Sequence, residues 1–323
     1  MDSVERKIAV VGSGVIGLTA ALRLLQSGFK VDIFYRDAFA ETASAAAGAY
    51  WWPHKAYPPE RVEGWSKRTL DYYRELRQNP DSGIRFETHY RFCLDPDECA
   101  YVRHLVDDCK AIDGSAYGVD SVEAYKVVVP VINVPVYMPF LQAQVQQAGA
   151  GFFQRELNDL AELEGDYDCI VNCSGLGART LVDDDSVFPI RGQVVLVSSD
   201  GLAAESYRIY AKDGPLTLVL PRGQDCVLGG TGQENDWDLD PREADTRAIL
   251  ERCAELVPAV ANAQVRDVTV GLRPGRLEIR LELETSVSGP PVIHNYGHGG
   301  GGYTVAWGCA EEVAKLVKNS CSG

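Results

Sequence analysis

The feature that most constrains this chain is a glycine turn near its start. An apolar run, 7–11, leads into Gly12, Gly14 and Gly17, which form the pattern GxGxxG. From Leu18 onward apolar residues recur at helical spacing, and a second apolar run covers 31–34. Strand, glycine turn, helix and strand within about 30 residues predict a right-handed βαβ unit in a parallel sheet.

Each glycine of this turn suits dinucleotide binding. Gly12 allows the tight turn, Gly14 lets the main chain approach a pyrophosphate, and Gly17 lets helix and strand pack closely. The N–H groups at the start of the helix would bind the phosphates, whereas ordinary turn glycines are the simpler alternative. The second strand usually ends in an acidic residue, but here Arg36 and Asp37 stand there. The fingerprint therefore leaves FAD, NAD and NADP open.

Length and charge narrow the class of protein. The 323 residues exceed the usual size of one domain, and the net charge of −15 disfavours nucleic acid and anionic lipid as partners. No apolar run approaches the roughly 20 residues of a membrane helix. Nine cysteines form no CxxC pair, which favours free thiols in a reducing compartment. We expect a cytoplasmic protein without a metal site.

The pattern changes twice along the chain. Residues 50–137 are rich in Tyr, Pro, Asp and Trp and suggest an insertion with one amphipathic helix over 62–77. Helical character returns at 138–148, and a buried strand at 169–173 resumes the first architecture. Residues 191–272 alternate strand patterns with one helix near 240–256, and the chain ends with a strand over 292–296, a glycine turn and a helix through 310–317. We therefore predict two interleaved domains.

A long C-terminal string identifies the family that this chain resembles. The segment 293–308, IHNYGHGGGGYTVAWG, resembles the signature of D-amino-acid and D-aspartate oxidases. Further blocks follow in family order, among them 191–193 (RGQ), 229–231 (GGT) and 270–274 (VGLRP). The likeness covers nearly the whole chain and is weakest over 55–135. It implies an α/β fold: a Rossmann-like FAD-binding domain (1–54, 138–190 and 273–323) with an interleaved α+β substrate domain (55–137 and 191–272) on a mixed, mostly antiparallel sheet.

The resemblance also implies non-covalent FAD as the cofactor. The residues implied to bind it are Gly12, Gly14, Val15, Ile16, Gly17, Arg36, Asp37, Ser44, Ala47, Gly48, Ala49, Leu157, Ser174, Gly175, Arg273, Gly299, Gly300, Gly301, Gly302, Tyr303 and Thr304. The glycine turn before the last helix has a physical role as well. It would offer N–H groups to the charge that builds on the flavin when it is reduced.

Substrate contacts are implied by the same likeness. Arg273 matches the arginine that binds the substrate carboxylate, since a planar guanidinium pairs with a carboxylate through two hydrogen bonds. A structural pair with Glu278 or Glu282 is the alternative. Gly300 matches the carbonyl that accepts a hydrogen bond from the amine. Leu218 stands where the family has a tyrosine on the carboxylate, and Tyr210 is the replacement that we favour over Tyr207.

The implied reaction is oxidative deamination of a D-amino acid. A hydride passes to flavin N5, oxygen takes the electrons, and the imino acid hydrolyses to a 2-oxo acid and ammonia. D-Aspartate oxidases place an arginine after the Gly-Gly-Thr block, but Gly232 follows here, so we expect neutral D-amino acids as substrates. A D-aspartate oxidase, a glycine or sarcosine oxidase, a redox sensor without catalysis and an NADP-dependent dehydrogenase are the alternatives. A homodimer is left open.

Overall fold

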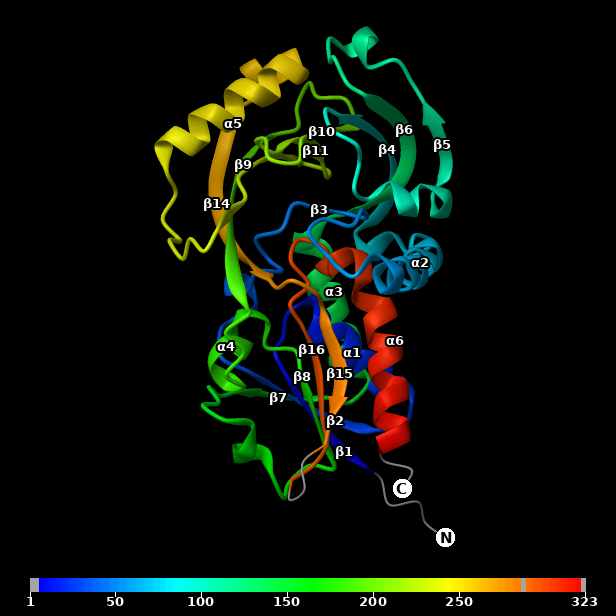
Figure 1. The fold of residues 1–323 in the computed structure, drawn as a ribbon, viewed down its shortest axis with the longest axis vertical. Coiled ribbons are helices and arrows are strands. Elements are labelled where there is room, and N and C mark those ends of the chain that lie inside the picture. Colours follow the sequence, from blue (N-terminus) through cyan, green and yellow to red (C-terminus); the bar gives the residue numbers. More distant parts are fainter. Residues whose placement is uncertain (1–5, 286–288, 321–323) are drawn as a thin grey trace.

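Two sheets of different character make up the molecule, one in each half of Figure 1. The structure, a computed structural model, describes residues 6–285 and 289–320. One sheet has six strands in the order β15-β16-β8-β1-β2-β7. The other has ten, and eight of these follow the order β13-β9-β12-β11-β10-β4-β6-β3, with β14 beside β9 and β5 beside β6.

The six-stranded sheet is parallel apart from one edge strand. Its strands are β1 (Lys7–Val11), β2 (Lys30–Tyr35), β7 (Gly151–Gln154), β8 (Cys169–Asn172), β15 (Arg280–Glu284) and β16 (Val292–Tyr296), and only β15 runs antiparallel to its neighbour. Three helices accompany it: α1 (Val15–Gln26), α3 (Val134–Gln147) and α6 (Gly302–Ser320), with α1 packed against the other two. The predicted βαβ unit is confirmed.

The ten-stranded sheet is mixed and mostly antiparallel. It contains β3 (Ala49–Tyr50), β4 (Ile84–Cys93), β5 (Asp107–Ala111), β6 (Glu123–Ile132), β9 (Phe188–Ser198), β10 (Ser206–Tyr210), β11 (Thr217–Pro221), β12 (Asp225–Gly229), β13 (Gln233–Glu234) and β14 (Val265–Gly275). Only β10 and β4 pair in parallel. Helix α5 (Glu243–Leu256) packs against β9, β11 and β12, whereas α2 (Pro59–Leu76) packs against α6. The short α4 (Ala178–Leu181) lies beside the parallel sheet (Figure 1). The predicted fold class is thereby confirmed.

The glycine turn after β1 shows why these residues are required. Gly12 has a φ of +116°, which L side chains rarely adopt, and a Cβ there would meet the Cys173 backbone. A Cβ on Gly17 would overlap the Gly12 carbonyl, so α1 can pack this closely to β1 only with glycine there. The helix then ends with Gly28 in the left-handed region at a φ of +87°.

The two long strands β9 and β14 link the halves of the molecule. They pair antiparallel from Val265 opposite Val197 to Gly275 opposite Phe188. In Figure 1 this ribbon runs from beneath α5 down to the parallel sheet. The sheet that contains residues 191–198 also includes 188–190 and the short β3, which lie outside the expected substrate-domain segments. The division into two domains stays a prediction.

Three further observations concern only the residues that the structure describes. The eight cysteines among them are free thiols, while Cys321 lies outside the described residues. None of their helices combines the length and the apolar character needed to cross a bilayer. No group of three or more His, Cys, Asp or Glu side chains in 6–285 and 289–320 is arranged to hold a metal ion.

Candidate active site

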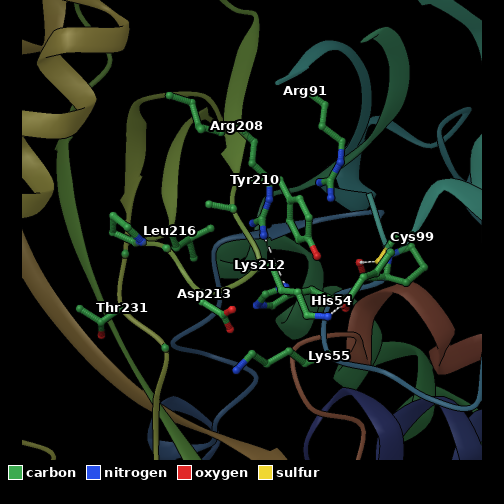
Figure 2. A pocket seen from close by; sticks show the side chains of 18 of the residues that line it. His54, Lys55, Arg91, Cys99, Arg208, Tyr210, Lys212, Asp213, Leu216 and Thr231 are labelled. Atoms are coloured by element: carbon green, nitrogen blue, oxygen red, sulfur yellow. Dashed lines mark hydrogen bonds and ion pairs between the residues drawn. The ribbon is translucent and has the colours of Figure 1, made fainter. Parts of the chain in front are cut away.

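A cavity of about 610 Å³ lies where the antiparallel sheet faces the loop 53–57. Its wall comes from that loop, from Arg91 on β4, from the end of β10 with the following segment 211–216, from the turn 230–232 and from α5. The residues Glu98, Cys99 and Tyr101 after β4 complete it. Figure 2 shows His54 and Lys55 on one side of the cavity and Arg208 and Tyr210 on another. Charged side chains are frequent on this wall, whereas a cavity inside an ordinary apolar core would have few of them.

Three neighbouring strands place a row of side chains on one face of the antiparallel sheet, and two of them, Arg91 and Arg208, line the cavity. Arg208 on β10 lies directly opposite Arg91 on β4 and opposite Leu218 on β11. Residues in register share one face of a sheet, so these three side chains adjoin one another. Arg91 is neutralised by Asp97, with Nε and Nη2 donating to the two carboxylate oxygens at 2.6 and 2.9 Å. Arg208 has no such partner among the described residues.

Arg273 lies near the lower end of β14 and is also without a carboxylate. Its Nη1 donates to the Thr231 carbonyl at 3.1 Å, and no ion pair of the described residues involves it. Burial, with the charge of Arg208 as the second cause, lowers the pKa of Arg273 to about 10. The structural alternative fails here, because Arg280 rather than Arg273 pairs with Glu282. Arg273 is thus a charged donor available to an anion.

The glycine turn before α6 packs against the loop 53–57. The Gly300 N–H donates to the His54 carbonyl at 3.1 Å, and the Gly299 N–H donates to the Pro274 carbonyl at 2.8 Å. A Cβ on Gly300 would lie 2.5 Å from the His54 ring, so only glycine fits. The Gly300 carbonyl oxygen accepts no hydrogen bond from the described residues. The turn therefore places a free acceptor close to the residue that follows Arg273.

Tyr210 lines the cavity, whereas Leu218 does not. The Tyr210 ring lies 5.0 Å from the Arg91 guanidinium, and burial, followed by the nearby Glu98 charge, raises the pKa of Tyr210 to about 12. In Figure 2 its hydroxyl points toward the loop that carries His54. The Leu218 side chain packs instead among Val131, Val194, Leu220 and Val227. Tyr207 faces the other side of the sheet, where it stacks on Tyr90.

The N-termini of α1 and α6 meet at the opposite end of the site. The Ser44 hydroxyl accepts a hydrogen bond from the Val15 N–H at 2.9 Å, and the Tyr303 hydroxyl donates to the Ser44 carbonyl at 2.8 Å. A Cβ on Gly302 would lie 3.7 Å from Val15, which shows how closely the two helices begin. The Thr304 hydroxyl bonds to the Trp52 main chain, so it fixes the loop before the cavity.

These two helix starts fit a dinucleotide with a flavin. The N–H groups of Ile16, Gly17, Gly302 and Tyr303 have no acceptor among the described residues, and neither helix has an acidic residue in its first turn. Free N–H groups and a positive helix end favour the negative charge of a pyrophosphate or of a reduced ring. The residues present therefore fit such a group.

The other residues implied by the resemblance surround this region. Arg36 and Asp37 follow β2 and bind each other through two hydrogen bonds of 2.8 and 2.7 Å. Leu157 packs in the apolar cluster that contains Phe34 at the same sheet edge. The remaining ones lie after β8, in the loop before β3 and at its first residue, and in the turn before α6: Ser174, Gly175, Ala47, Gly48, Ala49 and Gly301. Of these, Gly48 contacts Val227 of the other sheet, so both sheets border the site.

Four further positions, Thr231, Gly192, His54 and Arg208, matter to the geometry of the site, and the contacts that they make there were not predicted from the sequence. Thr231 accepts the Arg273 hydrogen bond, and a Cβ on Gly192 would overlap the Arg273 guanidinium. Gly192 and Thr231 belong to the family blocks 191–193 and 229–231, and this membership was the sequence feature that could have pointed to them. His54 and Arg208 approach each other, with Nη2 and Nδ1 3.4 Å apart. Burial, then the charges of Arg208 and Arg273, lower the pKa of His54 well below its usual range.

Comparisons with known proteins agree with this geometry. The model of a family described as FAD dependent oxidoreductase matches residues 7–316. The D-amino-acid oxidase of Rubrobacter xylanophilus is 41% identical over 97% of this chain and 96% of its own length. That of Streptomyces coelicolor is 38% identical over 98% of both chains. The D-aspartate oxidase of Homo sapiens is 32% identical over 96% of this chain and 94% of its own.

A solved structure shows the same fold. The glycine oxidase of Geobacillus kaustophilus superposes with a TM-score of 0.78 at 20% identity and covers 97% of this chain and 95% of its own. At that identity the likeness concerns the fold alone. The family model matches residues 7–316, and the D-amino-acid oxidase of Rubrobacter xylanophilus is similar over nearly the whole chain. The chain belongs to the family of FAD-dependent oxidoreductases.

Proposed function

We propose that this protein is a D-amino-acid oxidase that converts neutral D-amino acids to 2-oxo acids, ammonia and hydrogen peroxide. The observation that carries the proposal is Arg273, a guanidinium with no carboxylate partner among the described residues, placed between the cavity and the turn before α6. The relatives named D-amino-acid oxidase support the same reaction class.

Arg273 and Gly300 would together orient the substrate. The guanidinium binds the α-carboxylate through two hydrogen bonds, and the Gly300 carbonyl accepts one from the amine. The N–H of Gly299, the residue before Gly300, donates to the carbonyl of Pro274, the residue after Arg273. This hydrogen bond holds the two substrate contacts at a fixed separation. With two substituents of Cα held, the α-hydrogen of only one enantiomer points toward the cofactor. Tyr210 completes the substrate wall.

FAD, which the starts of α1 and α6 would hold, would supply the redox chemistry as the acceptor of the substrate's hydride and the source of electrons for oxygen. The protein's own histidines do not serve as strong bases here. Burial lowers the pKa of His298 to about 3, and the pKa of His54 is also lowered by burial and by two arginines. Both rings stay neutral at physiological pH and hold protons poorly. The amine therefore reacts in its neutral form, with the Gly300 carbonyl as its acceptor.

The turn after β12 supports neutral side chains. Gly232 follows Thr231 and leaves open space at its Cβ position, so no cation stands there. Glu234 is held by Lys55 at 2.5 Å and Asp236 by Arg242 at 2.7 Å. These carboxylates are thus neutralised locally rather than directed at a ligand. A D-aspartate oxidase is the second candidate, favoured by the 32% identity with the human enzyme of that name.

Peroxide release tests the proposal. The holoenzyme is incubated with D-valine, D-alanine, D-aspartate, glycine and L-valine, and kcat/KM is measured for each. We expect D-valine and D-alanine to react and L-valine to be inert. Reaction with D-aspartate alone would favour the second candidate, and peroxide from none of them would refute an oxidase. We further propose a cytoplasmic location and the interleaved domain division given above.

A further inference from the structure

Among the described residues, the arginines that are at most 4% exposed are paired with acids, with the exception of Arg208 at the cavity. Arg91, Arg191 and Arg222 are at most 4% exposed, and they pair with Asp97, Asp245 and Asp225. Arg208 is equally buried at 4%, yet no ion pair among the described residues includes it. An unpaired buried cation is costly, so a position that keeps one calls for an anion from outside the chain.

The Arg208 guanidinium is also short of hydrogen-bond acceptors. Its Nε is buried without a partner among the described residues, and its Nη2 lies 3.4 Å from His54 Nδ1, close to the limit for a hydrogen bond. Figure 2 shows the side chain directed from β10 toward His54 across the cavity. The donors of Arg208 are therefore both buried and available at the place where a ligand would lie.

Arg208 stands beside the residue that lacks the expected hydroxyl. Leu218 lies directly opposite it on β11, in the position where the family resemblance places a tyrosine that contacts the substrate carboxylate. Leucine offers no donor, and its side chain is occupied in an apolar cluster. The neighbouring strand thus supplies a donor that the expected position does not.

We infer that Arg208 is a second binding group for the substrate α-carboxylate, acting with Arg273 from the other side of the cavity. This inference rests on the proposed function, because it assigns Arg273 to the same carboxylate. A carboxylate has two oxygens, and each can face one guanidinium. The anion then relieves the repulsion between two nearby cations, which Tyr210 cannot do because its phenol stays neutral.

The test compares Arg208→Met and Arg208→Lys with Arg247→Met. Arg247 is an exposed residue of α5 whose side chain is 68% accessible, so this variant removes the same charge away from the cavity. Arg208→Met should lower kcat/KM for D-alanine and D-valine alike by about 10- to 100-fold, mainly through KM, because a charge-assisted contact made by the shared carboxylate is lost. Arg208→Lys should recover part of the loss, and Arg247→Met should lose nothing.

A binding measurement separates this inference from the proposed function. Propionate and propionamide are titrated into each holoenzyme, and the change in flavin absorbance is followed. We expect the dissociation constant of propionate to rise about 10-fold or more in Arg208→Met, with propionamide unaffected. If wild type oxidises no D-amino acid, the proposed function fails, while the propionate series still tests the carboxylate contact.

Three results would overturn the inference. Unchanged kinetics and unchanged propionate binding in Arg208→Met would show that Arg208 contacts no carboxylate. A loss confined to D-glutamate, with D-glutamine and D-alanine unchanged, would assign Arg208 to a side-chain carboxylate. Failure of both Arg208 variants to fold, judged by thermal unfolding, would assign it to the structure, since loss of an unpaired buried charge should not destabilise the protein.

Discussion

Replacing Arg273 with alanine should remove most of the activity and leave the fold intact. The guanidinium has one main-chain hydrogen bond, to Thr231, and no ion pair among the described residues. Two charge-assisted hydrogen bonds to a substrate carboxylate contribute about 1.5–3 kcal/mol each. At about 1.4 kcal/mol for each factor of ten, kcat/KM should fall by about 10²- to 10⁴-fold. Arg273→Lys should recover only part, because an ammonium cannot reproduce the planar fork.

The assay follows peroxide release from D-alanine, together with flavin absorbance and thermal unfolding. Arg276→Ala is the matched control: Arg276 is three residues away and pairs with Asp184 at 3.0 Å. It should lower the unfolding temperature and change kcat/KM little. In Arg273→Ala the unfolding temperature should stay constant or rise, because burial penalises the charged form of Arg273. A near-normal kcat/KM in Arg273→Ala would mean that another residue binds the carboxylate.

The remaining predictions concern the cofactor site and stability. Gly17→Ala should lower FAD content and the unfolding temperature, because its Cβ would overlap the Gly12 carbonyl. Gly28 has a φ of +87°, but a Cβ there would meet nothing within 4 Å, so Gly28→Ala should keep its FAD. Asp97→Asn should cost about 3–5 kcal/mol in urea unfolding, because it breaks a fully buried ion pair. Heat or acid should release FAD, and the mass of the denatured chain should show no added flavin. Although burial opposes its ionisation, hydrogen bonds from Ser186, Tyr296 and Arg276 lower the pKa of Asp184 to about 2. The carboxylate therefore stabilises the fold above pH 4 and loses this effect as the pH falls to 2, so the stability gap between wild type and Asp184→Asn should narrow on acidification.

Local patterns made the cofactor half of the fold predictable. The strand at 7–11, the turn at Gly12 and the helix from 15 depend on residues that are neighbours in sequence, and the strand over 292–296 has the observed bounds. The final helix begins earlier than the predicted 310–317, at Gly302, because the glycines 299–301 make the turn and the fourth starts the helix. Such elements can be recognised from neighbouring residues alone, without knowing which distant segments they pack against.

Strands β4 and β6 were not predicted, because their stability comes from distant partners. Each has ten residues, and they pair with each other across 84–132. In β4 two of the buried residues, His89 and Arg91, are polar, so the alternation of apolar residues that marks a strand is weak there. The unpaired state of Arg208 could not be predicted either, because the sequence shows arginines and acids close together and only the side-chain contacts show which arginine has no acid partner among the described residues.

Substitutions in the β9–β14 ribbon and substitutions in the segment 211–216 should affect substrate binding in different ways. Arg273 lies in that ribbon one residue before Pro274, whose carbonyl binds the turn before α6. The segment 211–216, by contrast, is a surface connection between β10 and β11. Substitutions there can alter which side chains enter without moving the groups that hold Cα. Directed evolution of substrate range should therefore begin with 211–216 and leave the ribbon untouched.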